Sequence, residues 1–177
     1  RPGSSYVMFA CHLRVKLRGA KKNNMVKIST DLIRKLREET GAPVIRVKKV
    51  LEEVSGGEKK AFEILRKEGF EKAAKRVGRE TSQGLIATYV HHSEKIASVV
   101  ELLCETDFVA RNELFKNLAH DLALQVASLG AKDAEELAGQ EFIKDPSKKV
   151  GDLVKEVIAK TGENIRVGRI FRVELGE

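Results

Sequence analysis

The run from Ile96 to Cys104 constrains the fold most, because a strand drawn through it is apolar on both of its faces. A strand of this kind is covered on both sides in a folded protein. The preceding residues, 84–92, alternate in polarity with a period of two, and Ser93-Glu94 separates the two segments. Together they predict an antiparallel hairpin whose second strand lies centrally in a sheet.

A helix is predicted directly after this hairpin. Thr106 is a good N-cap residue, and Asp107 lies in the first turn, beside the positive end of the helix dipole. Apolar residues then recur at helical spacing as far as Gly130; they are Phe115, Leu118, Leu122, Val126 and Leu129. Phe108 stands where the strand gives way to the helix. Its ring can either pack inward on the start of the helix or point outward to contact a partner.

The C-terminal third predicts two more helices and a closing strand. Residues 133–138 predict a short helix, and residues 150–158 predict an amphipathic helix that ends at Gly162. Residues 165–175 predict a strand. The order of these elements predicts an α+β core over residues 84–177, with helices packed on a small antiparallel three-stranded sheet.

A separate bundle of three short helices is predicted over residues 25–69. Ser29 or Thr30 begins the first helix, Gly41 ends it, and residues 55–57 separate the second helix from the third. Three helices of this length form a compact unit around a small shared core.

The charge of the chain is concentrated at its N-terminus. The net charge is +7, but residues 1–24 contain six basic residues and no acid, so the remainder carries only +1. A nearly neutral body argues against a nucleic-acid-binding protein. The segment Glu71–Val77 predicts a basic linking helix within a linker at residues 70–83, and we interpret its charges as a solvated face.

Composition and motifs exclude several classes of protein. With 42% hydrophobic and 33% charged residues, the chain is typical of globular proteins, and no apolar run is long enough to span a membrane. It contains no P-loop, no Gly-x-Ser-x-Gly elbow and no His-Glu-x-x-His helix, so we expect no enzyme. Cys11 and Cys104 have neither metal-site nor disulfide spacing. His91 and His92 are expected on opposite faces of a strand, where they could not share one metal ion.

Three motifs occur in the order and at about the spacing of one known family. They are Leu36-Arg37-Glu38-Glu39-Thr40-Gly41-Ala42, followed by Lys48-Lys49 and Leu51; Glu105-Thr106-Asp107-Phe108-Val109-Ala110; and Gly162-Glu163-Asn164-Ile165. From Met25 to Glu177 the chain therefore resembles translation elongation factor Ts, the exchange factor for the GTPase elongation factor Tu.

The resemblance implies where such a protein would contact its partner. Phe108 would enter a pocket in the G domain of elongation factor Tu, and Asp107 would orient the corner and contact the partner, with Thr106 and Val109 beside them. The helical bundle would be a ubiquitin-associated-like module that also docks on the G domain. Its contact residues would be Arg37, Thr40, Gly41, Ala42 and Lys48. GDP, GTP and magnesium would belong to the partner, so this chain would need no cofactor.

The helical module departs from the family at several positions. Pro43 replaces a usual Gly, Arg46 a usual acid and Val50 a usual Ala, and the run from Gly57 to Ala61 is one residue short. The docking of this module is therefore the least constrained part of the resemblance. From the residues alone, Thr40-Gly41-Ala42 can equally be an ordinary turn.

The resemblance also bears on oligomeric state and on the start of the chain. Longer members of the family carry two core halves and this sequence carries one, so we expect a homodimer through the sheet, with helical packing within the monomer as the alternative. Met25-Val26-Lys27-Ile28-Ser29 looks like a typical family start. We therefore expect residues 1–24 to be disordered or not native. If they are native, they have the composition of an organellar targeting extension.

Two other functions are compatible with the residues. The chain could be a small basic RNA-binding module that uses the basic tail and the helix near Lys72, or an adaptor that binds elongation factor Tu without accelerating nucleotide release. Steep salt dependence of RNA binding would indicate the first. A bacterial cytoplasmic location is expected, with a mitochondrion or plastid as the alternative if residues 1–24 are native.

Overall fold

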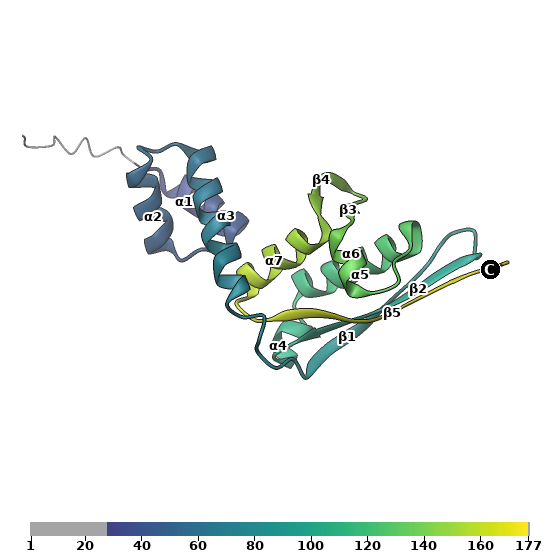
Figure 1. The fold of residues 1–177 in the computed structure, drawn as a ribbon. Helices are drawn as coiled ribbons and strands as arrows, with labels where there is room; N and C mark the ends of the chain where they lie inside the picture. The colour runs from purple at the N-terminus through teal and green to yellow at the C-terminus, as the bar shows by residue number, and fades with distance from the viewer. Residues whose placement is uncertain (1–27, 177) are drawn as a thin grey trace, which may run out of the picture.

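Seven helices and two antiparallel sheets make up residues 28–176, the part of the chain that the computed structural model describes (Figure 1). The helices are α1 (Thr30–Thr40), α2 (Val44–Glu53), α3 (Glu58–Ala74), α4 (Asp107–Ala110), α5 (Glu113–Leu129), α6 (Ala134–Gly139) and α7 (Val150–Thr161). The strands are β1 (Gln83–Val90), β2 (Ile96–Cys104), β3 (Glu141–Phe142), β4 (Asp145–Lys149) and β5 (Ile165–Glu174). The expectations for residues 1–24 and for Met25 lie outside the described residues.

Helices α1–α3 form the predicted three-helix bundle, which has a hydrophobic cluster of its own. The Ser29 side chain accepts a hydrogen bond from the Asp31 amide at the start of α1, and Gly41 ends this helix with a φ of 68°. The buried members of the cluster are Leu36, Val47, Val50, Leu51, Ala61 and Leu65. The similarity of this bundle to a ubiquitin-associated module stays a prediction.

The predicted end of the helical bundle at residue 69 is wrong, because α3 continues through Gly69 as far as Ala74. A separate linking helix at Glu71–Val77 therefore does not exist. A glycine inside a helix costs about 1 kcal/mol relative to alanine, which makes it look like a helix end in the sequence. In the structure, Gly69 lies where α3 approaches α7, and a Cβ there would be 3.2 Å from the Ala159 Cβ. The small residue permits close packing between the bundle and the core.

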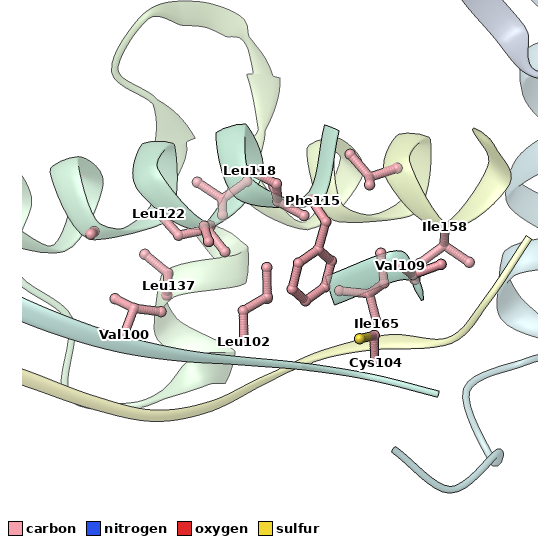
Figure 2. Packing of buried hydrophobic residues seen from close by; sticks show 14 of the residues in the cluster. Val100, Leu102, Cys104, Val109, Phe115, Leu118, Leu122, Leu137, Ile158 and Ile165 are labelled. Carbon is pink, nitrogen blue, oxygen red and sulfur yellow. The ribbon is translucent and has the colours of Figure 1, made fainter. Parts of the chain in front are cut away.

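The larger sheet has the strand order β1-β2-β5, and all neighbours are antiparallel, as predicted. Figure 1 shows α5, α6 and α7 on one side of this sheet. Alternate residues of β2, Val100, Leu102 and Cys104, are buried beneath these helices. Phe115 of α5 points from the helix layer toward β2 and belongs to the same cluster (Figure 2).

The opposite face of this sheet is open within the described part of the chain. Val99 of β2 pairs with Thr88 and Phe171 on this face. Around it, four large apolar side chains are exposed: Ile86, Val90, Phe171 and Val173. The alternative in which helices of the monomer cover both faces of β2 is therefore wrong for residues 28–176. Within residues 28–176, no helix covers this face (Figure 1).

Two local features differ from the sequence-based expectation. The helix that begins at the Thr106 corner is interrupted, because Asn112 accepts a hydrogen bond from the Leu114 amide (2.9 Å) and caps a new helix, α5. The predicted short helix near residues 133–138 is present as α6, but the β3–β4 hairpin after it was not anticipated. Pro146 and the neighbouring polar residues hide this hairpin, since they are depleted in strands.

Candidate functional site

The strand-to-helix corner, which we define as residues Thr106–Val109, exposes the aromatic ring of Phe108. The Phe108 side chain is 80% exposed, whereas the next residue, Val109, is 8% exposed and joins the core cluster. The interpretation in which Phe108 packs inward is therefore wrong. A large apolar ring held in water is available to a partner, and burying it would contribute about 1.5–3 kcal/mol.

The corner is a capped single helical turn. Thr106 is extended (φ −127°, ψ 158°), and its hydroxyl oxygen accepts from the Val109 amide at 3.5 Å. Asp107 forms an ion pair with Arg111 at 2.9 Å, and both groups are substantially exposed. Such a surface pair contributes little to stability. The Asp107 carboxylate therefore remains accessible for a contact with a partner.

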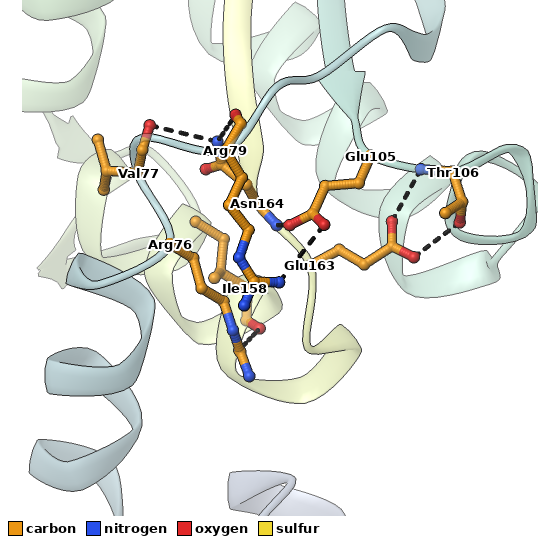
Figure 3. Close-up of polar contacts among 8 residues, drawn as sticks. All are labelled: Arg76, Val77, Arg79, Glu105, Thr106, Ile158, Glu163 and Asn164. Atoms are coloured by element: carbon orange, nitrogen blue, oxygen red, sulfur yellow. Dashed lines mark hydrogen bonds and ion pairs between the residues drawn. The ribbon is translucent and has the colours of Figure 1, made fainter.

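Two of the sequence motifs meet at this corner (Figure 3). The carboxylate of Glu163 accepts hydrogen bonds from the Thr106 amide (3.0 Å) and from the Thr106 hydroxyl (2.7 Å). The carboxylate of Glu105 accepts from the Asn164 amide at 2.6 Å. These four residues, Glu105, Thr106, Glu163 and Asn164, are called the junction clamp below. Sequence reasoning found both motifs but not their contact.

The junction clamp continues into the segment that follows α3. The buried Asn164 side-chain amide donates to the carbonyl oxygens of Val77 (3.3 Å) and Arg79 (2.8 Å). The Arg79 guanidinium lies 3.5 Å from the Glu105 carboxylate. One short turn after α7 therefore holds both the corner and the connection to the helical bundle.

Cys104 lies beneath the corner at the end of β2. Its thiol donates to the Thr106 carbonyl oxygen at 3.1 Å, and the side chain is fully buried. Burial raises the pKa of the Cys104 thiol, and the nearby Glu163 carboxylate raises it further. The thiol therefore stays protonated near neutral pH and packs as a small apolar group.

The predicted contact residues of the helical module occupy two different environments. Arg37 and Lys48 are exposed. Thr40 is buried, and its hydroxyl donates to the Leu36 carbonyl oxygen at 2.6 Å and accepts from the Ala42 amide at 3.4 Å. Thr40 and Ala42 thus form the end of α1 and the turn after it.

Gly41 explains why this turn lies so close to the core. A Cβ at this position would lie 2.7 Å from the Lys160 Cα of α7, closer than such atoms approach in proteins. Its φ of 68° also belongs to the left-handed region that favours glycine. The Thr40–Ala42 turn therefore contacts the rest of its own chain, whatever it contributes to a partner.

Arg46, one of the departures from the family pattern, has a structural role. Its Nε donates to Glu68 Oε2 at 2.9 Å, which links α2 to α3. The hydrogen bond from Arg46 lowers the pKa of the Glu68 carboxyl. Pro43 begins α2 without a side-chain cap. The change at position 46 is therefore compensated inside the bundle.

The histidine pair does not have the predicted geometry. β1 ends at Val90, so His91 and His92 lie in the turn rather than on a strand, and their ring centroids are 4.0 Å apart. His91 Nδ1 is hydrogen-bonded to the Ser93 hydroxyl at 2.8 Å. Among residues 28–176, no three His, Cys, Asp or Glu side chains are placed to hold a metal ion, and no helix is long and apolar enough to cross a membrane.

Comparison with known proteins identifies the family. A family model described as elongation factor TS matches residues 105–177, which include the corner and the junction clamp. Elongation factor Ts of Thermotoga maritima is 43% identical over an alignment that covers 86% of this chain and 98% of that protein. Elongation factor Ts of Clostridium botulinum strain Okra is 44% identical over 84% of this chain, which spans 48% of that longer protein. The chain belongs to the elongation factor Ts family.

Proposed function

We propose that this protein is a guanine nucleotide exchange factor that binds the G domain of elongation factor Tu and promotes GDP release during translation elongation. The observation that carries the proposal is the exposed Phe108 ring on a capped corner within the segment that matches the family. The corner presents Phe108 and Asp107 to the partner, while Thr106 and Val109 hold it on the core. The bacterial relatives support the cytoplasm as its place of action.

Exchange of this kind needs no covalent chemistry in this chain. The factor binds the nucleotide-free GTPase more tightly than the GDP-bound form, and by reciprocity GDP binds the complex more weakly by the same factor. GDP, GTP and magnesium are ligands of the GTPase. The protein thus acts through binding free energy, and the burial of Phe108 supplies part of it.

The helical bundle provides a second proposed contact with the G domain. Arg37 and Lys48 are exposed and can reach a partner directly. Thr40, Gly41 and Ala42 form the turn that lies against α7, so their proposed part in docking includes the placement of the bundle on the core.

Equilibrium binding tests this proposal. The affinity of the protein for elongation factor Tu is measured by titration calorimetry without nucleotide and at several GDP concentrations. The apparent affinity of the protein for elongation factor Tu should fall as the GDP concentration rises, and the affinity of elongation factor Tu for GDP should fall by the same factor when the protein is in excess. Binding that is unaffected by GDP would instead indicate an adaptor. Binding to RNA but not to the GTPase would indicate the RNA-binding alternative.

The open face of the sheet supports a homodimer as the proposed oligomeric state. Exposed apolar side chains on β1 and β5 flank Val99 of the central strand, and a second copy would bury them. Phe171→Glu places a charge beside Val99 and should convert the dimer to a monomer. The molar mass is measured by light scattering after size-exclusion chromatography.

A matched control separates a dimer contact from a general effect of added charge. Ile45→Glu introduces the same carboxylate at an exposed apolar position on α2, away from the sheet, and should leave the mass unchanged. A monomeric wild-type protein would contradict the dimer, and the open face would then be available to elongation factor Tu.

A further inference from the structure

We propose that Glu163 is a positioning residue for nucleotide exchange, because its carboxylate holds the helical turn that presents Phe108. The inference rests on the proposed function and deepens it. It assigns a role in exchange to a residue that lies 57 positions beyond Thr106 in the chain and belongs to a different motif.

The contacts in the junction clamp are reciprocal. Glu163 accepts from the main-chain amide of Thr106, and Glu105 accepts from the main-chain amide of Asn164. Glu105-Thr106 and Glu163-Asn164 thus each provide one carboxylate and one main-chain amide to the other pair. Hydrogen bonds to a charged acceptor are stronger than those between neutral groups. The two segments are therefore joined by more than van der Waals contact.

The junction clamp begins where the sheet ends. Cys104 and Ile165 form the terminal pair of β2 and β5, and the four residues of the clamp follow directly beyond this pair. Beyond this pair, the two segments are joined by hydrogen bonds from the Thr106 and Asn164 main-chain amides to side-chain carboxylates. The clamp extends the order of the sheet to Thr106, the N-cap of α4.

α4 needs such external support. It has four residues, and a helix this short is unstable unless other parts of the molecule hold it. Val109 is the buried side chain of α4, whereas Phe108 is 80% exposed and does not pack in the core. Both hydrogen bonds from Thr106 to Glu163 lie at the start of this turn. The direction of Phe108 therefore depends on Glu163.

A fixed direction of the Phe108 ring matters because ordering a flexible segment on binding costs conformational entropy. This cost weakens association. If the Phe108 ring is already oriented, less of the free energy of its burial is offset, and more is available to displace GDP. Loss of the Glu163 carboxylate should loosen α4 while leaving the helical bundle and its proposed contact in place.

The test is Glu163→Gln, combined with Phe108→Ala. Glutamine keeps the size of the side chain but loses its negative charge and has one acceptor oxygen in place of two, so its amino group faces one of the two donors of Thr106. The rate of GDP release from elongation factor Tu is measured against the concentration of each full-length variant. Glu163→Gln should lower the maximal rate about tenfold, with a much smaller change in the half-saturating concentration.

The double variant separates positioning from a general structural role. If Glu163 acts through Phe108, then Glu163→Gln should change the rate less than about twofold once Phe108 is alanine. An equal loss in both backgrounds would overturn the proposal. So would a wild-type rate for Glu163→Gln alone.

A stability control completes the experiment. Val126→Ala removes two methyl groups from a fully buried position on α5, away from the corner, so it should lower Tm without changing the maximal rate of the folded protein. A matching loss of rate in Val126→Ala would show that the Glu163→Gln effect is destabilisation, and would overturn the positioning role. If the wild-type protein does not accelerate GDP release, the proposed function itself fails, which is a distinct result.

Discussion

Phe108→Ala should slow factor-dependent GDP release from elongation factor Tu by about 10- to 150-fold at a fixed, subsaturating concentration. The ring is 80% exposed in the free protein and would be buried in the complex, so its removal deletes binding free energy without disturbing the core. Release is followed by stopped-flow fluorescence of a labelled GDP. The Tm should stay within a degree or two, because truncation of an exposed side chain changes the free energy of unfolding by about 0.5 kcal/mol or less.

Leu129→Ala is the matched control for this variant. Leu129 is also a large exposed apolar residue, but it lies at the C-terminal end of α5 rather than at the corner. Its truncation should leave the release rate unchanged. Equal acceleration by wild-type protein and Phe108→Ala would show that exchange does not require the Phe108 ring, while leaving the exchange function intact.

Phe115→Ala should have the opposite pattern, with a large effect on stability and a small one on exchange by the folded protein. The Phe115 ring is fully buried between α5 and β2. Deleting a buried phenylalanine side chain costs about 3–5 kcal/mol through lost burial and a residual cavity. For a chain of this size the Tm should fall by roughly 6–20 °C. Thermal unfolding followed by circular dichroism measures the change.

The two phenylalanine variants form a matched pair, since each loses the same atoms. The comparison tests directly which ring belongs to the core and which is available to a partner. A Tm that falls more in Phe108→Ala than in Phe115→Ala would contradict the assignment of both rings.

Local signals predicted much of this fold. The alternation that begins at residue 84, the apolar run of β2 and the stop at Gly162 each depend on a few neighbouring residues. The structure confirms the antiparallel hairpin, the central place of β2 in the sheet and the end of α7 at Gly162. The capping role of Thr106 was recognised for the same reason. The residues that make such patterns lie within the predicted element or directly beside it.

The sequence-based predictions were wrong where residues distant in the chain determine the local structure. Gly69 resembles a helix end, but its packing against α7 keeps it inside α3. The close approach of the His91 and His92 rings depends on where β1 ends, which the alternating pattern does not show. Tertiary contacts override local propensity at such positions.

The candidate site was predicted in part for the same reason. The residues of the corner were identified by resemblance, but residue type alone left the direction of Phe108 open. The phase of α4 decides it, by turning Val109 inward and Phe108 outward. The contact between Glu163 and Thr106 spans 57 positions in the chain, and no local pattern predicts it.

The rate of labelled-GDP release from elongation factor Tu, measured with increasing concentrations of this protein, tests the central claim most directly. Release should accelerate with concentration and reach a plateau, as expected when a ternary complex forms and GDP leaves it. A release rate that stays at its intrinsic value, with a protein shown to be folded, would contradict the exchange function.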